Sequence, residues 1–546
     1  MSLTELHLLD GEPVTTEDPD RVAAWPARLL LFLLLAGAVL VGLRSFTPPL
    51  PLGGLAPASE FAAQRAMSHV EAIAKAPPAG VESYLAGQLT ALGLSVETVE
   101  MPGRNVMARL RGTAPSGAIV LAATYDPLGA ASRSAGASTI LETLRAVSAG
   151  PKPKNDVIVL LSEAAEIPGA AFRLPGAAIV LTLERLGDRG PVALLSTSRE
   201  NGWLVREALR ELPHPTVFFA PRGVAPRSAP EGAAAWLSFV AIGGPATGTV
   251  TPDRATIQDA GATLLALVGR FGSLPLPGPK EADLVTFSVG RDQIVSHPAS
   301  WSRTLGTLSL ALALALAGLG FVRKKLSLQS LATGLVLVPA AVVAAAGAGS
   351  GLLALLVRSN PGGFLLPWGT AHAAWFSGAV LAFTVAVVAA LDVLLRAWRK
   401  TPLSDAGLAT AGLIWWSVAG LLTAFRDPAS AHLFVAPSLL IVPAFLVLFL
   451  TEEAARHPWL QASALALPAV AAILVLTPIW RLVDIAAGWS FPAPQLSLAA
   501  VSAGLGAFVA ALLLPHLSLP RRRWLFPLFC LVVTAGVVVA GARLTP

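Results

Sequence analysis

The chain has 546 residues, of which 54% are hydrophobic and 13% are charged, and its formal net charge is +6. Because ordinary soluble proteins are less apolar and more highly charged, a purely soluble enzyme is excluded. The single cysteine, Cys530, excludes an intramolecular disulfide and a thiolate metal cluster.

The first element is a candidate membrane anchor. Residues 1–26 form a polar, mostly acidic tail, and residues 27–43 read ARLLLFLLLAGAVLVGL, about the length that crosses a hydrocarbon core. The following RSFTPPLPLGG is a poor cleavage site for a signal peptide. We therefore expect a retained anchor and a cytoplasmic tail.

Residues 47–300 form a hydrophilic segment that is long enough for one external domain. Apolar residues at helical spacing predict helices, which lie at 59–75, 81–92 and 138–147. Alternating patterns predict half-buried strands, and continuously apolar runs predict interior strands. These strands lie at 94–101, 105–112, 118–126, 156–163 and 177–185. The order predicts an α/β domain with a mostly parallel sheet flanked by helices.

Acidic residues follow each of the three interior strands. They are Asp126, Glu163 with Glu166, and Glu184. Ligands of such sheets bind just beyond the carboxyl ends of the strands. The sequence therefore predicts a ligand or metal site at this edge.

The C-terminal part, residues 305–542, is predicted to be an all-α membrane domain. Its eight apolar runs are centred near residues 313, 343, 383, 413, 440, 470, 503 and 533. With the anchor they make about nine transmembrane helices. GAGSG at 347–351 is a place where two spans could approach closely.

The positive charges of the short connections predict the orientation. Twelve Lys and Arg residues fall on the side of the N-terminus and six on the other side, which favours a cytoplasmic N-terminus. The domain at 47–300 and the C-terminus then lie outside. The net positive charge reflects this topology, so we expect the lipid bilayer as a partner and no nucleic acid.

Several motifs in order carry a family resemblance. NVMARLRGTAPSGAIVLAATYDPL is followed by LETLRAV, NDVIVLLSEAAE, AAIVLTLERLGDRGP and TPDRATIQDAGATLLALVGRF. This stretch, residues 63–271, resembles the co-catalytic zinc metallopeptidases of family 28. With its spans, the whole chain looks like the multi-spanning branch that includes the endoplasmic-reticulum metallopeptidase and vacuolar membrane protease types. The resemblance implies an aminopeptidase-like hydrolase fold with two zinc ions.

The resemblance also implies specific ligand positions, and this chain departs from several. Thr124 stands where the family has its first histidine ligand, while Asp126 matches the aspartate that orients it. The bridging aspartate falls close to Ser132, whose hydroxyl does not bridge two zinc ions at neutral pH. The zinc-binding equipment is therefore incomplete.

The catalytic glutamate is missing as well. In GluAlaAlaGlu, Ala165 stands at the general-base position and Glu166 matches a ligand glutamate. Glu184 matches the next carboxylate ligand, and IGGPATGTVTPDR lacks the final histidine. Loss of a general base lowers the rate by about 10²- to 10⁴-fold.

The number and positions of the histidines indicate separately whether a zinc site can form. The external segment contains only His69, His214 and His297. His69 lies on a predicted helix and His297 next to the membrane, so neither is expected at the strand ends. His214 is flanked by prolines in a loop, and its recruitment as a ligand is disfavoured. Glu166 and Glu184 are vestigial ligands that, with Asp126, could hold a hard cation such as Ca²⁺ or Mg²⁺. Hydrogen bonds to Glu166 and Glu184 from the backbone or from Arg are the favoured alternative.

These observations favour a non-catalytic binding or assembly protein that needs no cofactor, with other membrane proteins or peptides as occupants of the cleft. Two alternatives stay open. One is an active zinc-dependent aminopeptidase with replacement ligands. The other is a transporter, which needs polar groups at mid-membrane depth. Its candidates are Asp392, Arg481, Asp484 and His516, all near predicted span ends. The composition suits a bacterial inner membrane.

Overall fold

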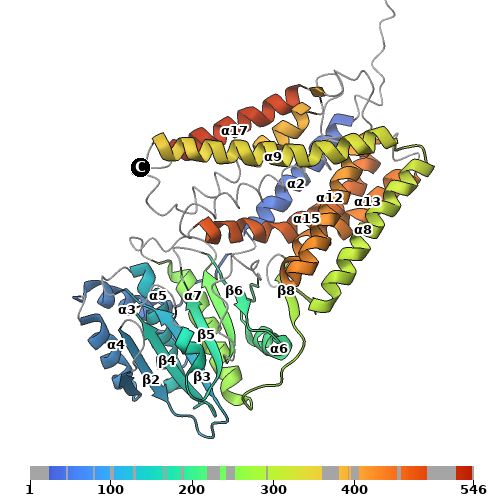
Figure 1. Cartoon of the computed structure of the whole chain (residues 1–546). Helices are drawn as coiled ribbons and strands as arrows, with labels where there is room; N and C mark the ends of the chain where they lie inside the picture. The colour runs from blue at the N-terminus through green and yellow to red at the C-terminus, as the bar shows by residue number, and fades with distance from the viewer. Residues whose placement is uncertain are drawn as a thin grey trace, which may run out of the picture.

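The structure is a computed structural model. It describes residues 24–44, 47–77, 80–98, 104–126, 131–163, 167, 169–184, 186, 190–217, 234–241, 252–289, 293–359, 380, 382–391, 393–394, 405–451, 457–487 and 524–543. An α/β domain and a group of long helices lie next to each other (Figure 1).

A seven-stranded sheet forms the centre of the domain, in the order β1-β2-β4-β3-β5-β7-β6. Its strands are β1 (Ser95–Thr98), β2 (Asn105–Leu110), β3 (Ala118–Thr124), β4 (Asp156–Ser162), β5 (Ala177–Glu184), β6 (Val192–Thr197) and β7 (Ala235–Ala241). The predicted strands are confirmed with ends shifted by a few residues. β6 and β7 have no counterpart among the predicted elements.

The sheet is mixed rather than mostly parallel. The pairs β4-β3, β3-β5 and β5-β7 are parallel, whereas β1-β2, β2-β4 and β7-β6 are antiparallel. The prediction of a mostly parallel sheet is therefore correct only for the four central strands. The connection from β1 to β2 is too short for a crossover, so these strands pair as a hairpin.

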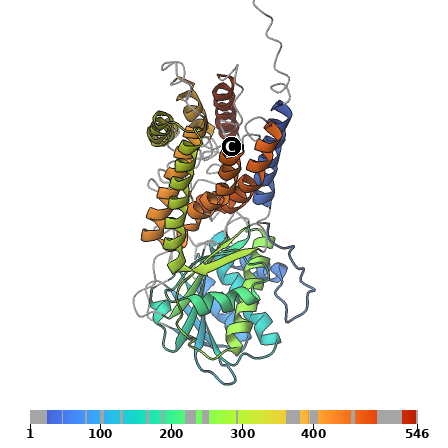
Figure 2. The ribbon, with the colours of Figure 1, turned by 90° about the vertical axis from the view of Figure 1, so that its right-hand side faces the viewer.

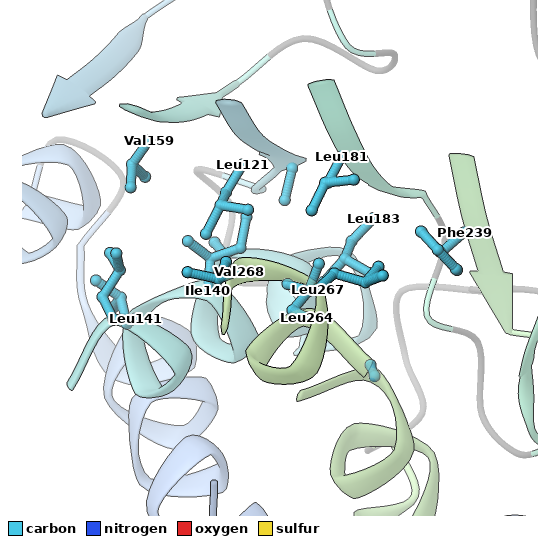
Figure 3. Packing of buried hydrophobic residues seen from close by; sticks show 14 of the residues in the cluster. Leu121, Ile140, Leu141, Val159, Leu181, Leu183, Phe239, Leu264, Leu267 and Val268 are labelled. Atoms are coloured by element: carbon cyan, nitrogen blue, oxygen red, sulfur yellow. The ribbon is translucent and has the colours of Figure 1, made fainter. Parts of the chain in front are cut away.

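Helices cover one face of the sheet. They are α3 (Ala63–Lys75), α5 (Ala131–Ala149) and α7 (Arg254–Ser273), while α4 (Gly80–Ala91) contacts β1 and β2, and α6 (Gly202–Glu211) packs on α7. Figure 3 shows the core beneath them, in which leucines of β3 and β5 face α5 and α7. The labelled leucines of the strands are Leu121, Leu181 and Leu183. On the other face, Phe172 of the short helix η1 (Gly169–Arg173) packs on Trp236.

The helix ends differ from those predicted. α3 begins at Ala63, four residues after the predicted start, because residues 53–60 form turns over the domain. α5 extends well beyond the predicted 138–147 in its N-terminal direction, since small residues at its start pack closely on the sheet. Gly136 shows this closeness, because a Cβ there would lie 3.0 Å from the Ala123 side chain.

Gln258 of α7 fastens the beginning of the domain. Its Oε1 accepts hydrogen bonds from the backbone N–H of Leu52 and of Ala63, each at 3.0 Å. Its Nε2 donates to the Phe61 carbonyl at 3.0 Å. The segment after the anchor is thus held by a residue near the end of the domain.

The helices outside the domain are α2 (Ala24–Arg44), α8 (Ala299–Val322), α9 (Leu328–Ser359), α12 (Asp405–Arg426), α13 (His432–Leu450), α15 (Pro458–Ala487) and α17 (Leu525–Arg543). α15 packs against α2 and α13, and α12 packs against α8 and α9. The predicted anchor lies in α2, and the run near residue 503 lies outside the described residues.

Three helices are long and apolar enough to cross a membrane. Within the described residues they are Ala299–Val322, Ala406–Arg426 and Pro428–Leu450. Other apolar helices in the described residues are shorter by the same measure, including Leu328–Ala344 and Pro527–Gly536. These helices are compatible with a membrane protein, and the total of nine spans stays a prediction.

Candidate functional site at the carboxyl edge of the central strands

Three of the sequence-predicted site residues lie at one edge of the sheet. Because β4, β3, β5 and β7 run in parallel, their carboxyl ends meet there. Thr124 ends β3 beside Ser162 of β4, and Glu184 ends β5 beside Val240 of β7. Asp126 follows two residues after β3. The predicted location of the site is thus the edge at which α/β sheets bind ligands.

Tyr125 lies between two of these positions and is nearly fully buried, with 1% exposure. Its backbone N–H donates to the Ser162 carbonyl at 2.8 Å, and its hydroxyl donates to the Arg104 carbonyl at 3.2 Å. Burial, assisted by Glu163, raises the pKa of Tyr125 to about 12. The phenol therefore stays neutral at physiological pH and acts as a structural donor.

Glu163 follows β4 at the same edge. Its backbone N–H donates to the Arg104 carbonyl at 3.0 Å, and its carboxylate lies 3.6 Å from Nε of Arg104. Both side chains are partly exposed, so this ion pair contributes little stability. Arg104 thus joins the start of β2 to the ends of β3 and β4.

Asp126 is buried, with 5% exposure, where the chain turns from β3 towards α5. Its backbone N–H lies 3.3 Å from the Ser134 hydroxyl oxygen, which accepts the hydrogen bond. Ser132 lies in the first turn of α5, close in sequence to this contact, and its side chain is outside the described residues. Ala165 and Glu166 are also outside them.

Glu184 faces hydroxyl groups of its own and the next strand. Its Oε1 accepts from Thr182 at 3.4 Å and from Ser238 of β7 at 3.3 Å. Both hydroxyl residues are almost fully buried. The carboxylate therefore serves as an acceptor for buried hydroxyls, whereas the sequence suggested backbone or Arg donors.

The hydroxyl row continues into β6 and was missed by the sequence interpretation. Ser238 is the register partner of both Thr182 on β5 and Ser196 on β6. Ser196 is 8% exposed, and its Oγ has no hydrogen-bond partner. Serine and threonine within otherwise apolar runs, as in LTLE and WLSFV, are the signal that could have revealed this row.

The described residues at this edge do not form a zinc site. Zinc in proteins takes nitrogen, sulfur and carboxylate ligands, usually with histidine among them at catalytic sites. Here a threonine, Thr124, ends β3, and the nearby Tyr125 is turned into the protein. No three His, Cys, Asp or Glu side chains gather in the part of the chain that the structure describes.

The three histidines of residues 47–300 have separate environments. His69 of α3 lies with Nδ1 2.7 Å from the Tyr84 hydroxyl of α4, and burial lowers the pKa of His69. Nδ1 of His297 donates to the Pro298 carbonyl at 3.0 Å. His214 lies in the loop after α6. Within the described residues, none of them joins a ligand group with the strand-end acids.

The transport candidates lie where the structure says little. Asp392 and His516 are outside the described residues, and Arg481 and Asp484 belong to α15 without described side chains. Among the described spans, Ser309 of α8 donates to Ser417 of α12 at 3.0 Å. This bond joins two helices, so it is a packing contact between them.

No family model matches the sequence, and no curated protein matches it. Solved structures are similar to part of the chain. The glutaminyl cyclase of Porphyromonas gingivalis is 14% identical, with a TM-score of 0.29, over 38% of this chain and 96% of its own. The LapA aminopeptidase of Legionella pneumophila is 11% identical, with a TM-score of 0.31, over 39% and 73%. A zinc aminopeptidase of Bacillus subtilis is 15% identical, with a TM-score of 0.23, over 30% and 49%.

Proposed function

We propose that the chain is a membrane-anchored binding or assembly protein whose external domain has a peptidase-like form without peptidase activity. The carrying observation is the donor chemistry at the sheet edge. Thr124 ends β3 where the family that the sequence resembles has an imidazole, and Glu184 is hydrogen-bonded by Thr182 and Ser238. Such groups position one another and lack the nitrogen donors that a pair of zinc ions requires.

The proposed setting is the outer face of a bilayer, with bacterial inner membrane as the compartment. The apolar helices and the charges of their connections support this setting. The occupants proposed for the carboxyl edge of the central strands are peptides or segments of other membrane proteins. Because the surviving acids Asp126 and Glu184 follow central strands, the edge remains the place where such an occupant would meet the domain.

The test uses the full chain, purified in detergent with zinc in the buffer and then freed of unbound metal. We expect less than stoichiometric zinc by elemental analysis, and no release of fluorophore from aminoacyl conjugates. A chelator should change neither result. Stoichiometric zinc together with chelator-sensitive release would instead establish the enzyme with replacement ligands.

Glu184→Gln serves as the matched variant in the same assays. If Glu184 is a metal ligand, the substitution should lower both the zinc content and the release rate. If it is an acceptor for hydroxyls, any background release should be unchanged and only thermal stability should fall. The combined variant Thr124→His, Ser132→Asp and Ala165→Glu shows whether the edge gains zinc when ligands and base are restored.

A further inference from the structure

A β-hairpin lies between the external domain and the membrane helices. It consists of β8 (Leu284–Ser288) and β9 (Ile294–Pro298), which pair antiparallel, and β9 leads directly into α8. β8 lies where the domain meets the helices (Figures 1 and 2). A flexible linker would be enough to attach the domain to α8. A folded hairpin packed on both sides therefore suggests a further role.

Hydrogen bonds join the hairpin to β6, the outermost strand on one side of the main sheet. Leu194 of β6 donates its N–H to the Thr216 carbonyl at 2.9 Å. The next residue, Val217, donates its N–H to Oγ of Ser288 at 2.9 Å and accepts from the Ser288 N–H at 3.0 Å. Residues 216–217 therefore link β6 to β8 without a break in the bonding.

A second set of bonds fixes the start of the hairpin. Asn201 donates its N–H to Asp283 Oδ1 at 3.1 Å, and its side-chain Oδ1 accepts from the Leu284 N–H at 2.9 Å. The Asp283 carbonyl accepts from the N–H of Ala299, the first residue of α8, at 2.8 Å. The start of α6, the hairpin and α8 thus share one junction.

The other side of the hairpin packs on the membrane helices. The Phe287 ring stacks on His432, the first residue of α13, with centroids 4.1 Å apart and an interplanar angle of 6°. Nδ1 of His432 donates to the Ala429 carbonyl at 2.8 Å, which fixes the ring plane. Phe287 and Val285 also form a buried cluster with Val475 of α15.

A two-stranded hairpin is only marginally stable by itself in water. Its order here depends on hydrogen bonds to the domain on one side and on packing against α13 and α15 on the other. If the hydrogen bonds to the domain are weakened, the hairpin packs less stably against α13 and α15. If that packing is weakened, the hydrogen bonds to the domain become less stable. By thermodynamic linkage such an effect is reciprocal.

We propose that the β8–β9 hairpin is a coupling element. It transmits changes between the carboxyl ends of the central strands, which β6 reaches through the sheet, and the first turn of α13. β6 is joined through β7 to β5, which carries Glu184. A ligand bound at the carboxyl ends of the central strands therefore alters how α13 packs against the hairpin. A partner bound to the helices alters the same strand ends in turn. The inference stands whether or not the domain is catalytic.

Amide hydrogen exchange of the full chain in detergent tests this coupling. His432→Ala removes the stack in the membrane helices, and the readout is the N–H of Leu194, Val217 and Ser288 in the domain. Loss of an aromatic stack worth about 1 kcal/mol should accelerate their exchange by about fivefold. His432→Phe keeps a ring against Phe287 and should preserve their protection.

The reverse experiment perturbs the domain and reads the helices. Ser288→Ala removes the acceptor of the Val217 N–H, and the exchange of the Val435 N–H, bonded to the Ala431 carbonyl at 2.9 Å, should accelerate. Leu422→Ala, at a side chain of α12 with 62% exposure, is the control and should change neither readout.

The proposal is overturned if His432→Ala accelerates exchange in the first turn of α13 while Leu194 and Val217 keep their protection. The Tyr125 N–H, bonded to the Ser162 carbonyl, reports whether the central sheet stays folded. If His432→Ala does not fold, Phe287→Leu replaces it, with the same readout in β6 and the same outcome counting against the coupling.

Discussion

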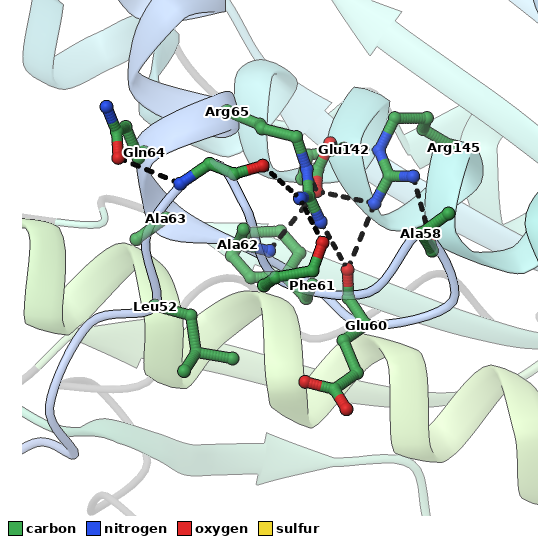
Figure 4. A network of polar contacts seen from close by, with 12 residues as sticks. Leu52, Ala58, Glu60, Phe61, Ala62, Ala63, Gln64, Arg65, Glu142 and Arg145 are labelled. Atoms are coloured by element: carbon green, nitrogen blue, oxygen red, sulfur yellow. Dashed lines mark hydrogen bonds and ion pairs between the residues drawn. The ribbon is translucent and has the colours of Figure 1, made fainter.

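Glu142 of α5 has a side chain with no exposed surface, yet it is held by several donors. It accepts from Nε of Arg65 at 2.8 Å, from Arg145 at 2.6 and 2.8 Å, and from the Ala62 N–H at 3.2 Å (Figure 4). The same two arginines donate to carbonyls of residues 54–60. One carboxylate thus organises the loop ahead of α3.

Glu142→Ala should destabilise the domain by about 3 kcal/mol, because it leaves two partly buried guanidinium groups without their anion. Thermal unfolding of the full chain measures this loss, and limited proteolysis at residues 54–60 should become faster. Glu71→Ala, at an exposed position of α3, is the control. Equal stability of the two variants would contradict the role given to Glu142.

His69 predicts a pH dependence of stability. Burial lowers the pKa of His69 below its ordinary 6.5, with Glu142 acting in the opposite direction. The unfolded chain therefore binds the proton more readily, so stability falls as the pH drops below 6.5. His69→Gln should reduce the difference in unfolding temperature between pH 7.5 and a pH below 6.5, as measured by differential scanning calorimetry.

His214→Gln is the control for this measurement, because it removes an external histidine that lies in a loop. Its unfolding temperature should follow pH as in the unmodified chain. If both variants respond alike, acid destabilisation arises from groups other than His69.

At the scale of single residues, the sequence located the edge acids but not their partners. Asp126 and Glu184 were predictable because continuously apolar runs end next to them. The bond from Tyr125 to the Arg104 carbonyl was not, since it depends on how the chain enters β2. Ser238 was missed because β7, which carries it, was not among the predicted strands.

Among the elements, α9 and α12 pack closely at a glycine. A Cβ added to Gly407 of α12 would meet the Ser330 side chain and lie 2.9 Å from its backbone carbonyl carbon. Gly407→Ala should therefore cost about 1–3 kcal/mol through overpacking. Thermal unfolding in detergent measures this cost. Gly347→Ala in α9, where no described residue lies within 4 Å of the added Cβ, should have little effect. Similar losses from both substitutions would contradict this packing.

The positions of glycines in the sequence did not indicate this contact between α9 and α12. GAGSG at 347–351 indicated a place where two spans could approach closely, and among the described residues nothing lies within 4 Å of a Cβ built at Gly347. Gly334 and Gly407 make the close contact between α9 and α12. Helix existence follows from apolar length, whereas the contacting face depends on which neighbour packs against it.

For the whole molecule, the predicted orientation is open to a labelling experiment. In a Cys530→Ser background, Lys152→Cys places a thiol at an exposed site of the domain, and Arg323→Cys places one at the end of α8. A membrane-impermeant maleimide should label the first in intact cells and the second only after permeabilisation. The opposite pattern would reverse the proposed topology.

The division into a domain and apolar helices was predictable from composition, because long apolar stretches and alternating ones occupy different parts of the chain. The directions of the outer strands were not. Apolar patterns indicate which strands are interior, but they do not indicate that β6 runs antiparallel to β7. The packing of β8 on α13 likewise arises only in three dimensions.

The bonds of Gln258 to Leu52 and Ala63 have a consequence for biosynthesis. Gln258 follows Leu52 by 206 residues, so at about 5–20 residues per second the ribosome needs about 10–40 s to produce it. During that interval the leucine-rich loop after the anchor has left the ribosome but has not yet formed its hydrogen bonds to Gln258. A translocon or chaperone that shields this loop would act within that window, and it would be released once α7 docks.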